Sequence, residues 1–343
     1  AMMPKSARTA RSIIFPLGLV AAVLSSLLSN TTTALLLLPV AIFLSEERIF
    51  QARFVLAIAY GASIGGIMTP IGTPPNLILM GFLESQGLPS IAFVKWIFLT
   101  MPLAIVMLAI MPWVLSLGLP KEHGEFAIHG EKPRMTAEQR KLTWVLVLLG
   151  GLLLLNSRIE PWYPGLGMDD KMIMLGFGLL MFVPGMNFLS WEDTRRIPYE
   201  IIFLFGAGFS IAGALVDSGL AQVIAQSLEA FAQFHAFFLI LVIAALITFS
   251  TEITSNTALV SLAVPIIYSL GQLAETSTVL ILMVATICGS YAFMLPIATP
   301  PNAIAMSSGA LRVKEMMSLG LVFNLLGITL VTLTAWFFWR WFL

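Results

Sequence analysis

A polar tripeptide recurs inside two otherwise apolar stretches of this chain, and the sequence around it recurs at a constant spacing. Ser29-Asn30-Thr31 stands within LLSNTTTALLLLP, and the same tripeptide returns as Ser255-Asn256-Thr257. Farther along, MTPIGTPPNLI over 68–78 returns as MLPIATPPNAI over 294–304 with the same offset in residue number, and eight of the eleven positions are identical. One copy would carry little information, but two paired motifs in the same register indicate an internal duplication.

Composition places this duplication in a membrane. The chain is 58% hydrophobic and only 10% charged, whereas soluble domains carry roughly 25% charged residues. Apolar runs of about 17 to 25 residues, long enough to cross a bilayer as helices, recur along nearly the whole length. We therefore expect an all-α polytopic membrane protein in contact with the lipid bilayer. The formal net charge of zero gives no indication of a nucleic-acid partner, and the single cysteine excludes an internal disulfide.

The order of the apolar runs predicts how the two copies are related. We expect helical hairpins at 12–44 and 236–270, helices broken by the Pro-Pro motif at 52–83 and 276–309, and further spans at 91–118, 141–157, 169–186, 198–217 and 314–341. Five crossings separate the hairpins, so they enter from opposite faces and the repeat is inverted. Residues 1–118 form the first repeat, 119–140 a cytoplasmic linker and 141–343 the second repeat. The three spans at 141–217 have no counterpart in the first repeat, so we expect their mates to be missing before residue 1.

Basic residues set the expected orientation. With the N-terminus and the 119–140 linker in the cytoplasm, only Lys95, Arg158, Lys171 and Arg340 fall outside, in agreement with the positive-inside rule. We expect a multi-pass protein of the cell inner (plasma) membrane with a cytoplasmic N-terminus and an external C-terminus.

The repeated motifs combine helix caps with helix breaks. We expect one helix to end at Ser29 and the next to begin near Thr31, with Asn30 and Thr31 as its N-caps. The consecutive prolines after Thr73 and Thr299 remove hydrogen-bond donors and break a helix. Helix N-termini at membrane depth suit anions, and unwound carbonyls suit cations. The two sets of motifs predict one anion site flanked by two cation sites.

The candidate cation ligands are neutral oxygens, which favour Na⁺ over a proton. The exception is Glu252, three residues before Ser255. It either hydrogen-bonds backbone near the hairpin tip or takes part in cation or proton coupling. No Lys or Arg lies within a span near the motifs, so bound Na⁺ would supply most of the positive charge that an anion meets.

At these residues the chain resembles the divalent anion/sodium symporter (DASS) family, and the resemblance covers essentially all 343 residues. It implies an elevator-type carrier with two re-entrant hairpins, a homodimer, Na⁺ as the coupling ion and a small dicarboxylate substrate. Threonine at the third place of both tripeptides resembles the C4-dicarboxylate members, which carry succinate, malate or fumarate. The residues that the resemblance assigns are Ser25, Ser29, Asn30 and Gly72 for the first cation site; Thr251, Ser255, Asn256 and Ala298 for the second; and Asn30, Thr31, Thr73, Asn256, Thr257, Thr299 and Pro300 for the substrate.

Other functions remain open at this point. A dicarboxylate exchanger or a sulfate or citrate carrier would share the fold, and a non-transporting membrane fragment is a further alternative. An intramembrane enzyme would need a nucleophile–base pair or metal ligands, and the expected spans hold no such set, so we predict that the chain is not an enzyme. A metal site at His123 and His129 is far less favoured than a solvated loop. The chain has no phosphate-binding loop of the kind that ATP-driven transport needs.

Overall fold

The computed structural model describes residues 9–119, 135–158, 162–186, 188–196, 199–227 and 235–343. These residues form helices joined by short turns, and no strand element occurs among them. The predicted all-α architecture is therefore confirmed. His123 and His129, with most of the predicted 119–140 linker, lie outside the described residues.

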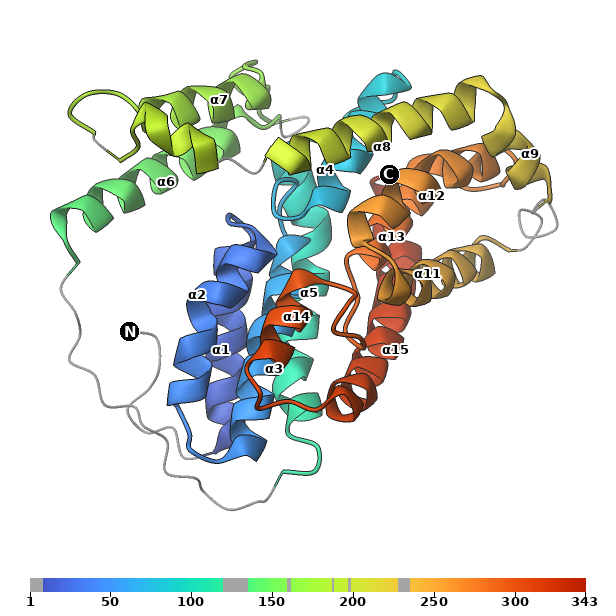
Figure 1. Ribbon diagram of the computed structural model, residues 1–343. Coiled ribbons are helices and arrows are strands. Elements are labelled where there is room, and N and C mark those ends of the chain that lie inside the picture. Colours follow the sequence, from blue (N-terminus) through green and yellow to red (C-terminus); the bar gives the residue numbers. More distant parts are fainter. Residues whose placement is uncertain (1–8, 120–134, 159–161, 187, 197–198, 228–234) are drawn as a thin grey trace.

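Two sets of five helices repeat along the chain (Figure 1). The first repeat comprises α1 (Ala10–Ser25), α2 (Asn30–Phe43), α3 (Arg48–Gly66), α4 (Pro74–Ser85) and α5 (Phe93–Leu115). The second repeat comprises α11 (Ala236–Ile253), α12 (Asn256–Gly271), α13 (Thr278–Gly289), α14 (Pro300–Ser307) and α15 (Val313–Phe337), followed by a 3₁₀ turn, η2 (Trp339–Trp341). The polar tripeptide marks the start of the second helix of each set, with its serine as the N-cap, and the Pro-Pro motif begins the fourth helix of each set.

The two repeats interlock through the short helices that follow the breaks. Helix α4 of the first repeat packs against α12 and α13, and α14 of the second repeat packs against α2 and α3. The two sets of contacts are equivalent, because α12 and α13 are the counterparts of α2 and α3. The helix that follows each Pro-Pro motif therefore packs against the other repeat, so each repeat contributes a helix to the core of its partner repeat.

Close helix contacts fix the first hairpin against α3. A Cβ atom at Gly61 would lie 2.5 Å from the Gly18 carbonyl oxygen, and one at Gly65 would lie 2.2 Å from the Ala22 carbonyl oxygen. Only glycine allows α1 and α3 to approach this closely, as is common where membrane helices pack. The backbone of the hairpin arm is thus held at a defined position on α3, which carries the first break.

The segment between the repeats contains α6 (Ala137–Asn156), α7 (Asp170–Leu180), the 3₁₀ turn η1 (Trp191–Arg196), α8 (Tyr199–Asp217) and α9 (Leu220–Ser227). In Figure 1, α6 and α7 stand to one side of the interlocked helices. A small cluster of Phe93, Leu153 and Ile173 joins this pair to the start of α5.

Four helical segments of the described part are long and apolar enough to cross a membrane: Arg48–Gly66, Phe93–Leu115, Ala236–Ile253 and Val313–Trp341. A fifth would be the pair Gly206–Asp217 and Leu220–Ser227, which is bent by 72°. The predicted span at 198–217 coincides with α8, whereas the helix within the predicted span at 169–186 is short. Helix α7 has only 11 residues and stops before Pro184 and Gly185, and Gly219, with φ of +73°, separates α8 from α9. Proline lacks a donor and glycine adopts the left-handed conformation, so both end helices.

Candidate functional site

The tip of each hairpin places a serine, and not the following asparagine, at the helix N-cap. Ser29 has extended backbone angles and its hydroxyl accepts a hydrogen bond from the Thr32 amide at 3.1 Å. Ser255 occupies the same place before α12. The prediction that Asn30 and Thr31 cap the second arm, and that the first arm ends at Ser29, is therefore wrong, since α1 ends at Ser25 and α2 begins at Asn30. A cap needs extended backbone, and Asn30 already has helical backbone, which leaves its amide side chain available for another contact.

That asparagine reaches back across the turn to a hydroxyl of the first arm. Ser25 Oγ lies 2.6 Å from Asn30 Oδ1, and in the second repeat Thr251 Oγ1 lies 2.6 Å from Asn256 Oδ1. The two pairs are related by the same offset in residue number as the motifs. Ser25 and Thr251 are both fully buried, whereas Asn30 and Asn256 are half-buried. Each hairpin tip thus presents two neutral oxygens at the edge of the buried interior.

A third oxygen joins the pair in the second repeat. Thr251 Oγ1 also lies 3.0 Å from the carbonyl oxygen of Gly289, the last residue of α13. A hydroxyl has a single proton, so it cannot donate to the amide oxygen and to the carbonyl oxygen at once. Three converging oxygens that share one proton suit a hard cation, which prefers oxygen ligands. The residues present therefore fit Na⁺.

The Pro-Pro motifs begin α4 and α14 in the same way. Thr73 and Thr299 are the N-cap residues with extended backbone, and the two prolines occupy the first two helical positions, where their missing amides have no intrahelical partner to lose. Both threonines are buried, and the Thr299 hydroxyl accepts from the Asn302 amide at 3.4 Å. Each break thus ends in a helix N-terminus inside the protein, where the two prolines carry no amide proton and the backbone amide of the following asparagine bonds back to the threonine.

The asparagine that ends each Thr-Pro-Pro-Asn motif bonds to the unwound backbone of the break. The side-chain amide of Asn76 donates to the carbonyl oxygens of Gly66 and Thr69 at 3.1 and 2.8 Å. Asn302 donates to those of Ala292 and Leu295, both at 3.0 Å. These are equivalent positions, and both asparagines are fully buried. Sequence reasoning assigned roles to the threonines of the motif and gave none to its asparagines; their identity in both copies of the motif was the available signal.

Gly66 connects the first break to the first hairpin tip. A Cβ atom at Gly66 would lie 2.7 Å from Asn30 Oδ1, and one at Gly72 would lie 2.5 Å from the Gly66 carbonyl oxygen. The structure therefore brings Ser25, Asn30 and Gly72 together around Gly66. The Ser29 hydroxyl is not part of this group, because it caps α2 and contacts Thr32 Oγ1 at 2.7 Å.

The other predicted residues lie on the same elements with different exposure. Thr257 is buried in the first turn of α12, Ala298 is buried just before Thr299, and Pro300 is exposed at the start of α14. Thr31 is half-buried in the first turn of α2, and Ser255 is exposed. Since α4 packs on α12 and α14 packs on α2, the residues of each Pro-Pro motif lie on a helix that contacts the hairpin of the other repeat.

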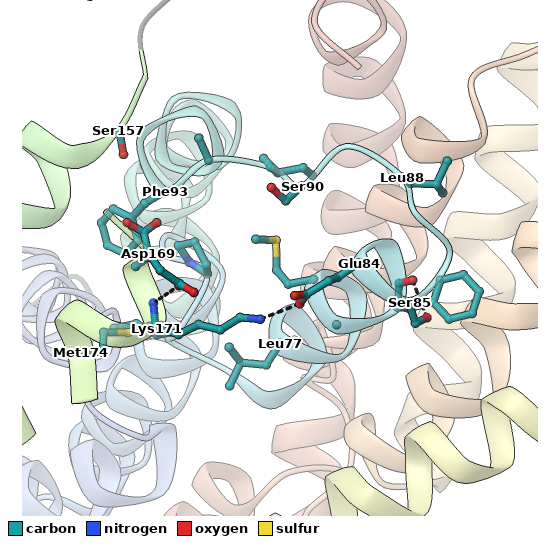
Figure 2. Close-up of a pocket in the computed structure, with 18 of the residues that line it drawn as sticks. Leu77, Glu84, Ser85, Leu88, Ser90, Phe93, Ser157, Asp169, Lys171 and Met174 are labelled. Atoms are coloured by element: carbon teal, nitrogen blue, oxygen red, sulfur yellow. Dashed lines mark hydrogen bonds and ion pairs between the residues drawn. The ribbon is translucent and has the colours of Figure 1, made fainter. Parts of the chain in front are cut away.

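A cavity of about 1230 Å³ lies between α4, the 86–92 loop, the start of α7 and α8. Figure 2 shows Lys171 reaching from the beginning of α7 to Glu84 on α4, with Nζ and Oε2 2.6 Å apart. This hydrogen bond raises the pKa of Lys171. None of the predicted substrate-binding residues lines the cavity, which approaches the first break only at Pro70 and Ile71. The cavity is therefore distinct from the predicted site.

No cluster of three or more His, Cys, Asp or Glu side chains that could hold a metal ion occurs in the described part of the chain. The candidate cation ligands in this part are hydroxyl, amide and carbonyl oxygens.

Comparison with known proteins gives consistent matches. The model of the family described as citrate transporter, CitMHS, matches residues 1–289. A sodium-dependent dicarboxylate transporter, SdcS, of Staphylococcus saprophyticus is 29% identical over 347 residues, covering 92% of this chain and 66% of the relative. An uncharacterized transporter of Haemophilus influenzae is 32% identical over 340 residues, covering 94% of this chain and 72% of the relative. The chain thus spans just under two thirds of the SdcS length.

One solved structure has a similar fold. The YdaH transporter of Alcanivorax borkumensis, described as having an unusual topology, aligns with a TM-score of 0.59 at 15% identity. The alignment covers 96% of this chain and 79% of the other. At this identity the likeness concerns the fold alone.

Proposed function

Because this chain belongs to the citrate transporter family CitMHS, and with it to the divalent anion/sodium symporters (DASS), we propose that it forms the substrate-carrying part of a secondary carrier that takes up C4-dicarboxylates with Na⁺. The observation that carries this proposal is the duplicated oxygen pair. Ser25 with Asn30, and Thr251 with Asn256, have the same 2.6 Å separation at equivalent places in two interlocked repeats.

The two oxygen pairs would each hold one Na⁺. Ser25, Ser29, Asn30 and Gly72 would form the first site, and Ser29 would contribute through its backbone carbonyl because its hydroxyl caps α2. Thr251, Ser255, Asn256 and Ala298 would form the second site. Unwound carbonyls at the end of a half-helix are typical Na⁺ ligands in carriers. Bound Na⁺ supplies positive charge next to the anion.

The substrate would lie between the two hairpin tips. Its carboxylates would contact the amides and hydroxyls at the starts of α2 and α12 and the hydroxyls at the starts of α4 and α14, where the positive ends of the helix dipoles favour an anion. The residues concerned are Asn30, Thr31, Thr73, Asn256, Thr257, Thr299 and Pro300. These side chains carry no positive charge, so anion binding without Na⁺ would be weak. This is the physical reason for coupling.

The substrate class follows the curated relatives. SdcS is named as a sodium-dependent dicarboxylate transporter, which favours succinate, malate or fumarate. The description of the matching family model favours citrate as a second candidate. Under this proposal residues 1–118 form the first inverted repeat and residues 141–343 the second, which then includes α6, α7, α8 and α9 in addition to the five helices that match the first repeat. The carrier is a homodimer that moves by an elevator-like displacement in the inner membrane, with a cytoplasmic N-terminus.

Thermal stabilisation of the purified chain tests the proposal. We expect succinate to raise the melting temperature in NaCl and to have little effect in choline chloride at the same ionic strength. Stabilisation by citrate but not by succinate would select the second candidate. Equal stabilisation by succinate in both salts would show that the anion site does not depend on Na⁺ and would contradict the coupling model.

A further inference from the structure

A buried carboxylate holds the second break and has no equivalent in the first. Glu252 lies in the last turn of α11 and is only 3% exposed. Its Oε1 accepts hydrogen bonds from the amides of Phe293 and Met294 at 2.7 and 2.9 Å, and its Oε2 accepts from the amide of Leu295 at 2.9 Å. Three successive backbone amides of the unwound segment therefore point at one side chain.

Two further contacts complete this arrangement. Asn324 of α15 donates its side-chain amide to Glu252 Oε1 at 2.7 Å. Tyr60 of α3 donates its hydroxyl to the Phe293 carbonyl oxygen at 2.8 Å. All four groups bonded to the carboxylate donate to it, which matches the acceptor oxygens of a carboxylate.

No basic side chain among the described residues forms an ion pair with Glu252; Arg48 pairs with Glu315, and Lys171 pairs with Glu84. Burying an ionised carboxylate is costly unless hydrogen bonds or an opposite charge compensate for it. Four donors compensate in part. A cation bound nearby would complete the compensation, and the neighbouring residue Thr251 belongs to the three-oxygen group that fits Na⁺.

The equivalent place in the first repeat is neutral. Ser26 precedes Ser29 by the same three positions that separate Glu252 from Ser255. Its hydroxyl bonds to the Val23 carbonyl oxygen, and its own carbonyl accepts from the Thr69 hydroxyl at 2.5 Å. The first break is held instead through its carbonyls, by two side chains of α5, Trp96 and Thr100. Hairpin and break are thus joined in both repeats, but only the second junction carries a charge.

We propose that Glu252 is a positioning residue that makes the cation site of the second repeat the tighter of the two, by fixing the 293–295 backbone beside that site and by placing a carboxylate at the residue next to Thr251. The second site then fills at lower Na⁺ concentration than the first. The ligand class is a monovalent alkali cation. This inference rests on the two cation sites of the proposed function and deepens them, because it assigns their order.

The test follows Na⁺ binding by thermal stabilisation of the purified chain, as NaCl replaces choline chloride without substrate. In Glu252→Gln we expect the lowest half-maximal Na⁺ concentration to rise about tenfold or more, because a buried charge acts through a low effective dielectric. Glu315→Gln is the matched control: it removes the same charge from a partly exposed side chain paired with Arg48, and should leave the Na⁺ titration unchanged.

Asn324→Leu separates the two contributions of Glu252. It removes one donor and leaves the carboxylate and its three backbone contacts. We expect it to lower the melting temperature in choline chloride while shifting the Na⁺ titration far less than Glu252→Gln does. Equal shifts in both variants would mean that only the hydrogen bonds matter, which would overturn the electrostatic part of the proposal.

A second pair of variants keeps the proposal testable if Glu252→Gln does not fold. Thr251→Ala should abolish the response at the lowest Na⁺ concentrations, whereas Ser25→Ala should spare it and remove the response at higher concentrations. The reverse order would overturn the inference while leaving two cation sites and the proposed function in place. A wild-type chain with no Na⁺ response would overturn both.

Discussion

Gly66→Ala is the substitution that best separates the stability of this chain from the integrity of its first cation site. Gly66 is the last residue of α3, and an added Cβ atom would lie 2.7 Å from Asn30 Oδ1 and 3.1 Å from Asn30 Nδ2. Non-bonded contacts to carbon are ordinarily about 3.4 Å or longer. The Asn30 amide would therefore have to retreat by about 0.7 Å.

This displacement has different consequences for folding and for binding. Moving Asn30 Oδ1 by about 0.7 Å directly away would lengthen its 2.6 Å contact with Ser25 Oγ to about 3.3 Å, outside the usual range for hydroxyl hydrogen bonds. The loss of that bond would cost about 1 kcal/mol. Replacing helical glycine by alanine would return up to about 0.5–1 kcal/mol, so the free energy of unfolding should change by less than about 1 kcal/mol. Binding sites tolerate displacements of only about 0.5 Å, so Na⁺ affinity at the first site should fall about tenfold or more.

The assay compares three glycine variants by melting temperature in choline chloride and by Na⁺ titration. Gly66→Ala should keep a nearly normal melting temperature and lose the response at higher Na⁺ concentrations. Gly65→Ala should be strongly destabilised, because its Cβ would lie 2.2 Å from the backbone oxygen of Ala22, which cannot move without α1. Gly150→Ala, where no atom lies within 4 Å of the new Cβ, should be silent in both measurements. A normal Na⁺ titration in Gly66→Ala would refute the placement of Asn30 in a cation site.

Three further predictions concern the same elements. Asn30→Ala and Asn256→Ala should each abolish stabilisation by succinate in NaCl, because each asparagine would serve a cation site and the anion site; normal Na⁺-dependent binding in either variant would exclude shared ligands. Asn302→Ala should lower the melting temperature, because the carbonyls of Ala292 and Leu295 would lose a donor and the free energy of unfolding would fall by about 2 kcal/mol. Differential scanning fluorimetry measures this decrease, with Ser307→Ala as the exposed control. Lys171→Ala should change the melting temperature little, because the ion pair with Glu84 has both side chains more than half exposed; a large decrease would show that α7 is held by this contact.

Much of the helical arrangement could be predicted because helix breaks and apolar runs are local features. The expected hairpin at 12–44 encloses most of α1 and all of α2, and the expected broken helix at 52–83 encloses most of α3, the break and most of α4. The all-α fold followed from the composition and the apolar runs, and the paired motifs carried the resemblance to the family. The main difference lies between the repeats, where α7 ends at Leu180, ahead of the turn at Gly185, and the apolar content of the predicted 169–186 span did not show this early end.

The candidate site was predictable in its residue types but not in its contacts. Neutral oxygens in duplicated motifs pointed to Na⁺ from the sequence. The sequence did not show that Ser29 would cap α2 and leave Asn30 to bond Ser25, because cap geometry depends on where the backbone changes conformation. The sequence also did not show that Asn76 and Asn302 are buried and donate to carbonyls of the breaks. The acceptor carbonyls lie seven and ten residues earlier in the chain, and they come within reach only because the chain reverses direction at the break.

The amino-acid order by itself determined that this chain is a membrane protein built from a duplicated unit, because hydrophobicity and proline breaks act within a few residues. Tertiary structure alone decided that α4 and α14 exchange partners between the repeats, and that Glu252 receives the amides of 293–295 from a distant part of the sequence. Both depend on which surfaces meet after folding. In a membrane every buried backbone group needs a partner, so the final packing determines which side chain supplies it.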